Sequence, residues 1–282
     1  ANLRLLSWPA RATAIFGYSR DDLGDEPLAA LLGDNEDSAR RVALASLRHT
    51  GAGNSRVELR HRRKDGSVVY CEWFNSALTN EAGEVTSVMS LVQDVSARFQ
   101  AAEQLRFIAE HDSLTGLPNR AALHKRIDSA LQLARDSGEQ VALLFIDLDG
   151  FKRVNDSFGH AAGDIVLQET ARRISASVRE TDTVARLGGD EFVVLLEGDV
   201  NDSSCQSVSA SILAAIQPAY TFALRHSDGS ETTVTTSVGA SIGVAIQPPL
   251  ESQVERLFKR ADDAMYAAKR AGKGCVRVAD SA

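Results

Sequence analysis

A short turn with two adjacent glycines and two adjacent acids, Gly188-Gly189-Asp190-Glu191, constrains this chain more than any other segment. Apolar and β-branched residues flank it, Thr183 to Ala185 before and Phe192 to Leu196 after, which predicts a hairpin whose tight turn carries the acids. Glycine tolerates positive φ and lets an anion approach the backbone. Adjacent carboxylates repel each other unless a cation lies between them, so the turn suits a divalent metal that carries nucleotide phosphates. A plain Gly-Gly turn with solvated acids is the alternative.

Length, charge and cysteines limit the class of protein. The 282 residues are enough for two domains, and no apolar run is long enough to span a membrane. A net charge of −7 argues against a protein that coats nucleic acid. Cys71, Cys205 and Cys275 form neither a zinc pattern nor a disulfide framework, so we expect a cytoplasmic location. The chain starts without Met, which leads us to expect a longer protein with membrane or phosphodiesterase segments beyond this stretch.

Residues 1–98 are expected to form a first domain of short helices followed by an antiparallel sheet. Arg40 to His49 is predicted to be a helix. Val57–Arg62 and Val68–Phe74 alternate like strands, and the turn Lys64-Asp65-Gly66-Ser67 joins them as a hairpin. A last strand is predicted at Val85–Val92.

This first part resembles a PAS sensor domain. The residues that carry the resemblance are Phe16-Gly17-Tyr18-Ser19, the Lys64–Ser67 turn and the closing Asp94-Val95-Ser96. The PAS ligand stays unknown, because no flavin-attaching cysteine motif is present and a lone His49 is more often a surface residue than a haem ligand.

Residues 99–111 contain no Gly or Pro, and helix formers predict a connecting helix there. Ala101, Leu105 and Ile108 follow the 4-then-3 spacing of a short coiled-coil seam. A plain connecting helix is the alternative.

Residues 112–282 bring several chemical groups into one domain. The apolar run Val141–Ile146 predicts a buried central strand, and Asp147 stands at its end. Lys269 and Lys273 lie in and just after the last predicted helix, Glu255–Arg270, at i and i+4, and are expected to share a face. Acids that hold metal and lysines that hold phosphates are what phosphoryl or nucleotidyl transfer needs. Taken singly, each of these residues also fits a turn or a solvated helix face.

The segment from Asp112 to Val278 closely resembles the GGDEF domain of diguanylate cyclases, whose name is spelled by Gly188 to Phe192. The resemblance implies a central sheet wrapped by helices, related to nucleotidyl cyclase and polymerase palm folds. The whole chain is then a two-domain protein of mixed α+β and α/β class. The resemblance also implies that two GTP molecules give cyclic di-GMP and two pyrophosphates.

The family pattern assigns metal binding to the Asp147 and Asp190 carboxylates and the Leu148 carbonyl. Two Mg²⁺ or Mn²⁺ ions per GTP site would bridge the triphosphate and lower the pKa of the attacking 3′-hydroxyl. Asp147, Asp190 and Glu191 are the expected catalytic residues, with Glu191 in catalytic support or deprotonation.

Asn155 and Asp164 match the guanine readers of the family. The amide can donate to O6 and the carboxylate can accept from N1–H and N2–H, which favours GTP over ATP. Lys273 stands where family members often carry Arg. Lysine keeps the positive charge but lacks the planar guanidinium group that can donate two parallel hydrogen bonds to a phosphate. The other expected GTP contacts are Gly150, Phe151, Lys152, Gly188, Gly189, Lys269 and Lys273.

Arg179 and Asp182 match the Arg-x-x-Asp product-inhibition site of the family, so we expect cyclic di-GMP to bind there. Because each GGDEF domain holds one GTP, the reaction implies a homodimer, which the PAS domain and the connecting helix would organise. The alternative is a non-catalytic receptor for GTP or cyclic di-GMP that regulates an absent phosphodiesterase domain.

Overall fold

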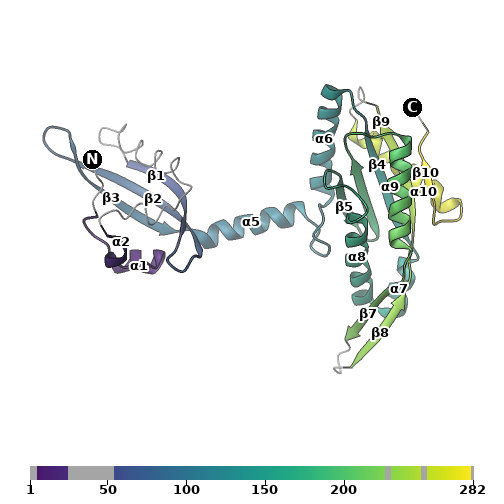
Figure 1. Ribbon diagram of the computed structural model, residues 1–282, viewed down its shortest axis with the longest axis horizontal. Helices are drawn as coiled ribbons and strands as arrows, with labels where there is room; N and C mark the ends of the chain where they lie inside the picture. Colours follow the sequence, from purple (N-terminus) through teal and green to yellow (C-terminus); the bar gives the residue numbers. More distant parts are fainter. Residues whose placement is uncertain (1–4, 25–53, 226–229, 249–252, 281–282) are drawn as a thin grey trace. The chain divides into compact units, whose positions relative to one another are not determined.

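The computed structural model describes residues 5–24, 54–225, 230–248 and 253–280 (Figure 1). The helix predicted at Arg40–His49 lies outside these residues. The chain divides into two compact units, residues 1–105 and 106–282, and each is described by itself. In the described parts of the chain, no helix is both long and apolar enough to cross a membrane.

The first unit contains an antiparallel sheet in the order β1 (Asn54–Arg62), β2 (Val68–Thr79) and β3 (Val85–Asp94). The short helices α1 (Ala10–Phe16) and α2 (Arg20–Leu23) precede it. Phe16 is fully buried and forms a core with Leu23, Val69 and Cys71. The predicted hairpin turn is present, with the Arg63 N–H donating to the Ser67 carbonyl.

The closing Asp94-Val95-Ser96 segment fastens the last strand to the sheet. The Val95 N–H donates to the Tyr70 carbonyl, and the Tyr70 N–H donates to Ser96 Oγ. Asp94 accepts from Arg63 at 2.9 Å. The predicted connecting helix is present as α5 (Ser96–Glu110), which starts three residues earlier than predicted, and none of its side chains is buried. The predicted seam residues therefore face solvent in this chain.

The second unit is built on a sheet in the order β10 (Val276–Val278), β9 (Gly239–Gln247), β4 (Val141–Asp149), β6 (Glu191–Leu196) and β5 (Thr183–Gly188). The predicted central strand β4 pairs antiparallel with both β6 and β9, and only β10 runs parallel to its neighbour. β7 (Tyr220–Arg225) and β8 (Glu231–Thr236) form a separate antiparallel pair.

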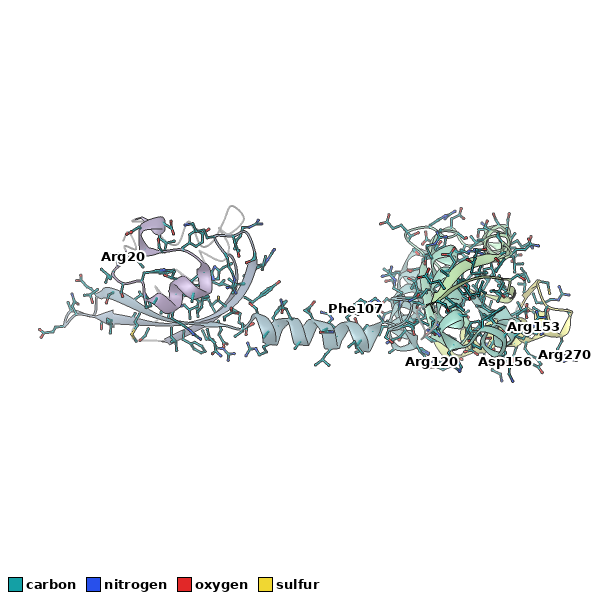
Figure 2. The ribbon with its side chains drawn as sticks, turned by 90° about the horizontal axis from the view of Figure 1, so that it is seen from below. Arg20, Phe107, Arg120, Arg153, Asp156 and Arg270 are labelled. Atoms are coloured by element: carbon teal, nitrogen blue, oxygen red, sulfur yellow. The ribbon has the colours of Figure 1, made fainter. Side chains whose placement is uncertain are left out.

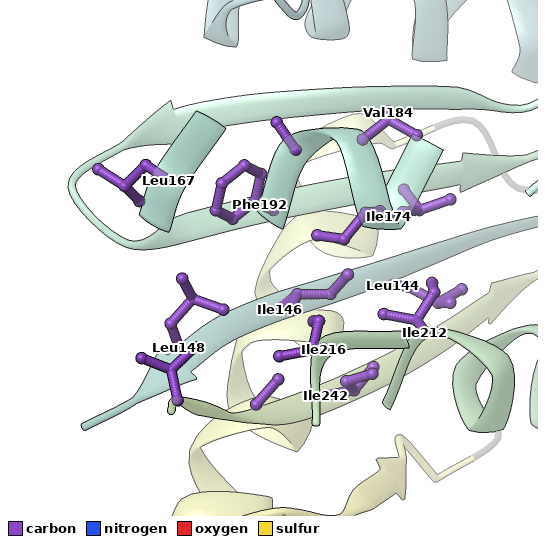
Figure 3. Packing of buried hydrophobic residues seen from close by; sticks show 14 of the residues in the cluster. Leu144, Ile146, Leu148, Leu167, Ile174, Val184, Phe192, Ile212, Ile216 and Ile242 are labelled. Carbon is purple, nitrogen blue, oxygen red and sulfur yellow. The ribbon is translucent and has the colours of Figure 1, made fainter. Parts of the chain in front are cut away.

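Alternate residues of β4 serve two different cores, because successive side chains point to opposite faces of a sheet. Leu144, Ile146 and Leu148 pack with residues of α7 (Phe151–Phe158), α8 (His160–Ser175) and α9 (Asp202–Ile216) (Figure 3). Leu143 and Phe145 pack with residues of α6 (Arg120–Ser137) and α10 (Val254–Arg270). Both faces of the sheet are thus covered by helices.

Residues 151–158 directly follow the buried strand and form helix α7, which was not predicted from the sequence. The segment from Val234 to Ile246 is mostly strand and is divided between β8 and β9, which belong to different sheets. Helix α8 begins at His160, so Gly163 lies within its first turn.

Candidate functional site

The acids meet where β4 and the β5–β6 hairpin end. In the β4–β6 register Asp147 lies directly opposite Glu191. Gly188 pairs with Glu191, so Gly189 and Asp190 form the two-residue turn, as the sequence predicts. Gly188 and Gly189 have φ values of 142° and 52°, which side chains rarely adopt. Residues directly opposite on neighbouring strands project on the same face, so Asp147 and Glu191 are neighbours.

Two sets of hydrogen bonds hold the turn against the rest of the site. The Leu148 N–H donates to the Asp190 carbonyl at 3.2 Å, which ties the turn to the end of β4. Arg186 donates through Nη2 and Nε to the Gly189 carbonyl at 2.7 and 3.1 Å. The same guanidinium pairs with Asp112 at 2.8 Å. The position of Asp190 is therefore fixed through its backbone, and its side chain is left available.

The site carries an excess of negative charge. Burial raises the pKa of Asp147, and the charges of Asp190 and Asp149 add to the rise, although a hydrogen bond from Lys269 opposes it. Burial also raises the pKa of Glu191, to which Asp147, Asp262 and Asp190 contribute, while Arg120 opposes it. Each carboxylate would gain from a further cation beside it.

A divalent cation fits this set of groups. Oxygen ligands are what Mg²⁺ prefers, and both expected carboxylate ligands belong to this acidic group, because the charge of Asp190 helps to raise the pKa of Asp147. Across the described residues, no three His, Cys, Asp or Glu side chains are arranged to hold an ion. The expected ligand set needs only two carboxylates, of Asp147 and Asp190, together with the Leu148 carbonyl.

Lys269 contacts the acids directly. Its Nζ lies 2.6 Å from Asp147 Oδ2, and the lysine projects from α10 on the side of the sheet that Asp147 faces. The expectation that Lys269 and Lys273 share a helix face is wrong, because α10 ends at Arg270. Lys273 lies in the following turn with φ 67°. That turn is held by the neighbouring Gly274 N–H, which donates to Asp149 at 3.0 Å.

The predicted guanine readers lie on two consecutive helices. Gly150, the residue before the first turn of α7, has φ 85°, which glycine tolerates without strain. Asn155 lies on α7 and is half-buried, while Asp164 lies on α8 and is exposed. The same helix α7 carries Phe151, which is buried, and Lys152, which is exposed. Figure 2 labels Arg153 and Asp156 of this helix.

The Arg179–Asp182 segment forms a closed turn after α8. The Arg179 N–H donates to Asp182 Oδ2 at 2.9 Å, and the Asp182 N–H donates back to the Arg179 carbonyl at 3.1 Å. Arg179 is exposed and Asp182 is half-buried. The turn leaves the guanidinium free to reach a ligand.

Several residues of the site were not singled out from the sequence. Arg186 and Asp112 support the turn, Ser241 donates to Asp149 at 2.9 Å, and Arg120 and Asp262 act on Glu191. Of these residues, only Arg186 could have been assigned to the site from the sequence, because it lies close before the glycine turn. The others are distant in sequence and become neighbours only through strand pairing and helix packing.

Family models match both units of the chain. Residues 109–275 match the family model described as diguanylate cyclase, GGDEF domain, and residues 4–97 match a PAS domain model. The chain is 44% identical over 209 residues to diguanylate cyclase TpbB of Pseudomonas aeruginosa, covering 74% of this chain and 44% of that protein. It is 34% identical over 271 residues to probable diguanylate cyclase DgcE of Escherichia coli, covering 95% of this chain and 23% of that protein.

The second unit is also similar to a solved structure of a GGDEF domain. The isolated GGDEF domain of TpbB from P. aeruginosa is 46% identical to the matching part of this chain, with a TM-score of 0.53. The match covers 60% of this chain and 94% of that structure. The chain thus spans less than half the length of the two curated relatives, at 44% and 23%.

Proposed function

The chain belongs to the GGDEF family of diguanylate cyclases and carries a PAS domain ahead of the GGDEF domain, and on this premise we propose that it condenses two GTP molecules into cyclic di-GMP and two pyrophosphates. The observation that carries the proposal is the register that sets Asp147 opposite Glu191, next to the turn of Asp190 and within reach of Lys269. We further propose the domain limits 1–98, 99–111 and 112–282 for the PAS domain, the linker and the cyclase.

Asp147, Asp190 and the Leu148 carbonyl would hold two Mg²⁺ or Mn²⁺ ions per GTP site. When bound, these ions supply charge neutralisation for the triphosphate and favour deprotonation of the 3′-hydroxyl. Glu191, beside Asp147 on the same sheet face, is positioned to take part in that proton removal. Desolvation by the sheet and helix α10 strengthens each of these charge interactions.

The remaining roles concern binding and orientation of GTP. Asn155 and Asp164 read the guanine edge, as donor to O6 and acceptor from N1–H and N2–H. The triphosphate lies against the start of α7 and the glycine turn, where backbone N–H groups and lysines supply positive charge. The residues assigned to the phosphates are Gly150, Phe151, Lys152, Gly188, Gly189, Lys269 and Lys273.

One GTP per cyclase unit cannot close the product, because each phosphodiester bond joins two nucleotides held head to tail. We therefore propose that the chain acts as a homodimer with two GGDEF units facing each other. The PAS domain would control what fraction of the chains forms dimers with facing GGDEF units. Cyclic di-GMP bound at Arg179 and Asp182 would lower that fraction. Since GTP is the substrate and the cysteines are unpaired, the cyclase unit would work in the reducing cytoplasm.

The test is direct synthesis. The purified chain, over a range of concentrations, is incubated with GTP and Mg²⁺, and the products are separated by chromatography. We expect cyclic di-GMP and pyrophosphate in a ratio of one to two, with a rate per chain that rises as dimers form. Asp190→Ala is expected to abolish the product, whereas Asp128→Ala, which removes an exposed acid of α6, leaves it unchanged.

Two results would contradict the proposal. Bound GTP without any product at every concentration would favour a nucleotide receptor. Products that contain adenosine in a mixture of ATP and GTP would mean a different cyclic nucleotide.

A further inference from the structure

Gly163 lies inside helix α8 and is buried, one residue before Asp164. Glycine is a poorer helix former than alanine, so a buried glycine within a helix calls for a steric reason. Its backbone is helical and its φ is not positive, so conformational freedom is not that reason. The explanation has to lie in what a side chain at this position would contact.

A Cβ atom on Gly163 would collide with Asn155. The added carbon would lie 2.0 Å from Asn155 Oδ1 and 3.0 Å from Asn155 Cγ, with Phe151 Cζ at 3.1 Å. The Asn155 amide thus occupies the space in which a larger residue of α8 would have its side chain. The Asn155 amide can take this position only because position 163 has no Cβ.

The contact also determines how the amide points. Asn155 Oδ1 is buried and has no hydrogen-bond partner in the described structure. With its oxygen end against Gly163, the amide directs its nitrogen end away from Gly163, and Asp164, the next residue of α8, is exposed. A buried oxygen without a partner is costly, and such costs are typical of residues held in place for binding.

We propose that Gly163 is a positioning residue for base recognition: by lacking a Cβ it seats the Asn155 amide beside Asp164 and so determines the depth at which guanine is read. The inference rests on the proposed function, because it deepens the role given there to Asn155 and Asp164. Gly163 itself touches neither the base nor the reacting atoms.

Gly243 provides a useful contrast. A Cβ there would lie 2.1 Å from the Ala261 carbonyl oxygen and 2.1 Å from the Met265 nitrogen, which are backbone atoms of α10. That clash can be relieved only by moving a helix. The Gly163 clash involves the far end of a side chain, so alanine at 163 displaces the Asn155 amide and leaves the helix in place.

Nucleotide binding by the full chain tests this inference without turnover. Affinities for GTP and for inosine triphosphate are measured by calorimetry with Ca²⁺ for wild type, Gly163→Ala, Asn155→Ala and the double variant. Ala161→Gly, at an exposed position of the same helix, controls for the change in helix propensity. Inosine triphosphate keeps O6 but lacks the 2-amino group, so it isolates the part of the base that Asn155 is assigned to read.

We expect Gly163→Ala to weaken binding of both nucleotides by the same factor, roughly tenfold to a hundredfold, which is typical for loss of base-edge hydrogen bonds. Asn155→Ala should produce a similar loss. Since Gly163 acts through Asn155, adding Gly163→Ala to Asn155→Ala should weaken binding no further. Ala161→Gly should bind as wild type does.

The outcomes separate the inference from the proposed function. Unchanged affinity in Gly163→Ala, or a further loss in the double variant, overturns the inference alone. An unchanged affinity in Asn155→Ala overturns the proposed base recognition as well. If Gly163→Ala does not fold, thermal unfolding decides: restored folding in the double variant supports a clash with Asn155, and failure of both variants to fold overturns it.

Discussion

Asp147 already has a cationic partner in Lys269, at 2.6 Å. A divalent ion at Asp147 would compete with that lysine for the same carboxylate oxygen. The ion pair stabilises the charged Asp147 carboxylate without nucleotide, and under the proposed function a metal that took over this carboxylate would release Lys269 toward the phosphates.

Lys269→Ala is accordingly expected to have opposite effects on metal and on nucleotide. Without nucleotide, Mn²⁺ should bind more tightly because the competing ammonium is gone, by a factor of about five to ten for one partly exposed ion pair. GTP affinity should fall, since one phosphate contact is lost. Electron paramagnetic resonance of Mn²⁺ and calorimetry with GTP measure both quantities, and Lys259→Ala, on the same helix, provides the control. A parallel loss of both affinities would contradict the competition.

Arg179 belongs to a turn whose backbone is closed by Asp182. Because the exposed guanidinium takes no part in that closure, Arg179→Ala should leave the turn intact and remove only the proposed contact with cyclic di-GMP. We expect product inhibition to weaken by roughly tenfold or more, as for loss of a charge-assisted hydrogen bond. Initial rates at rising cyclic di-GMP measure the change, with Glu180→Ala as the control. Inhibition unchanged in Arg179→Ala would locate the product site elsewhere.

At the scale of elements, Arg186 joins the loop at Asp112 to the β5–β6 hairpin, and only 8% of its surface is exposed. Removing one partner of a largely buried ion pair typically costs about 3 to 5 kcal/mol. Asp112 is partly exposed, so we expect Arg186→Met to lower the free energy of unfolding of the second unit by about 2 to 3 kcal/mol. Urea unfolding measures this cost. Arg126→Met, which breaks a more exposed pair with Glu197, should cost less than about 1 kcal/mol.

The same ion pair gives a dependence on pH with a definite sign. Burial alone would raise the pKa of Asp112, but hydrogen bonds from Thr115 and Arg186 outweigh it and lower the pKa. A lowered folded-state pKa stabilises the fold above the ordinary value of about 3.9, and this contribution is lost as the pH falls through the lowered value. The difference in stability between wild type and Arg186→Met should therefore be constant near pH 7 and shrink below about pH 4. A constant difference down to pH 2 would contradict this assignment.

The elements that the sequence predicted well are those with long, regular apolar patterns. β4 is buried along eight successive positions, and α10 begins within one residue of its predicted start and ends at Arg270. Helix α7 was missed because only Phe151 and Val154 are buried in its two turns, too few to show a helical period. The register that sets Asp147 opposite Glu191 joins segments more than 40 residues apart, and local sequence carries no information on such pairing.

At the scale of the whole molecule, the chain offers one buried thiol in each compact unit, Cys71 in the first and Cys205 in the second. Burial raises the pKa of Cys71 to about 12 and that of Cys205 to about 11, so neither thiol should react while its unit is folded. Each unit has its own core, and α5, at their boundary, buries no side chain. The two units are therefore expected to unfold independently.

Thiol labelling in rising urea tests this expectation. With Cys275 replaced by serine, Cys71 and Cys205 should become reactive at different urea concentrations, and mass spectrometry of peptides assigns each transition. A variant that keeps only Cys275, which is partly exposed, serves as the reference for a thiol accessible in the native state. Coincident transitions for the two buried thiols would mean that the units unfold as one.

The backbone conformation of Lys273 sets stability of the fold against activity of the site. Among the described residues it is the only non-glycine with positive φ, and glycines stand on both sides of it. Lysine in this left-handed conformation costs about 1 to 2 kcal/mol of folding stability relative to a glycine at the same position. If Lys273 contacts the phosphates as proposed, the chain accepts this cost in stability to place a positive charge on a tightly bent loop, and a glycine there would give a more stable but less active protein.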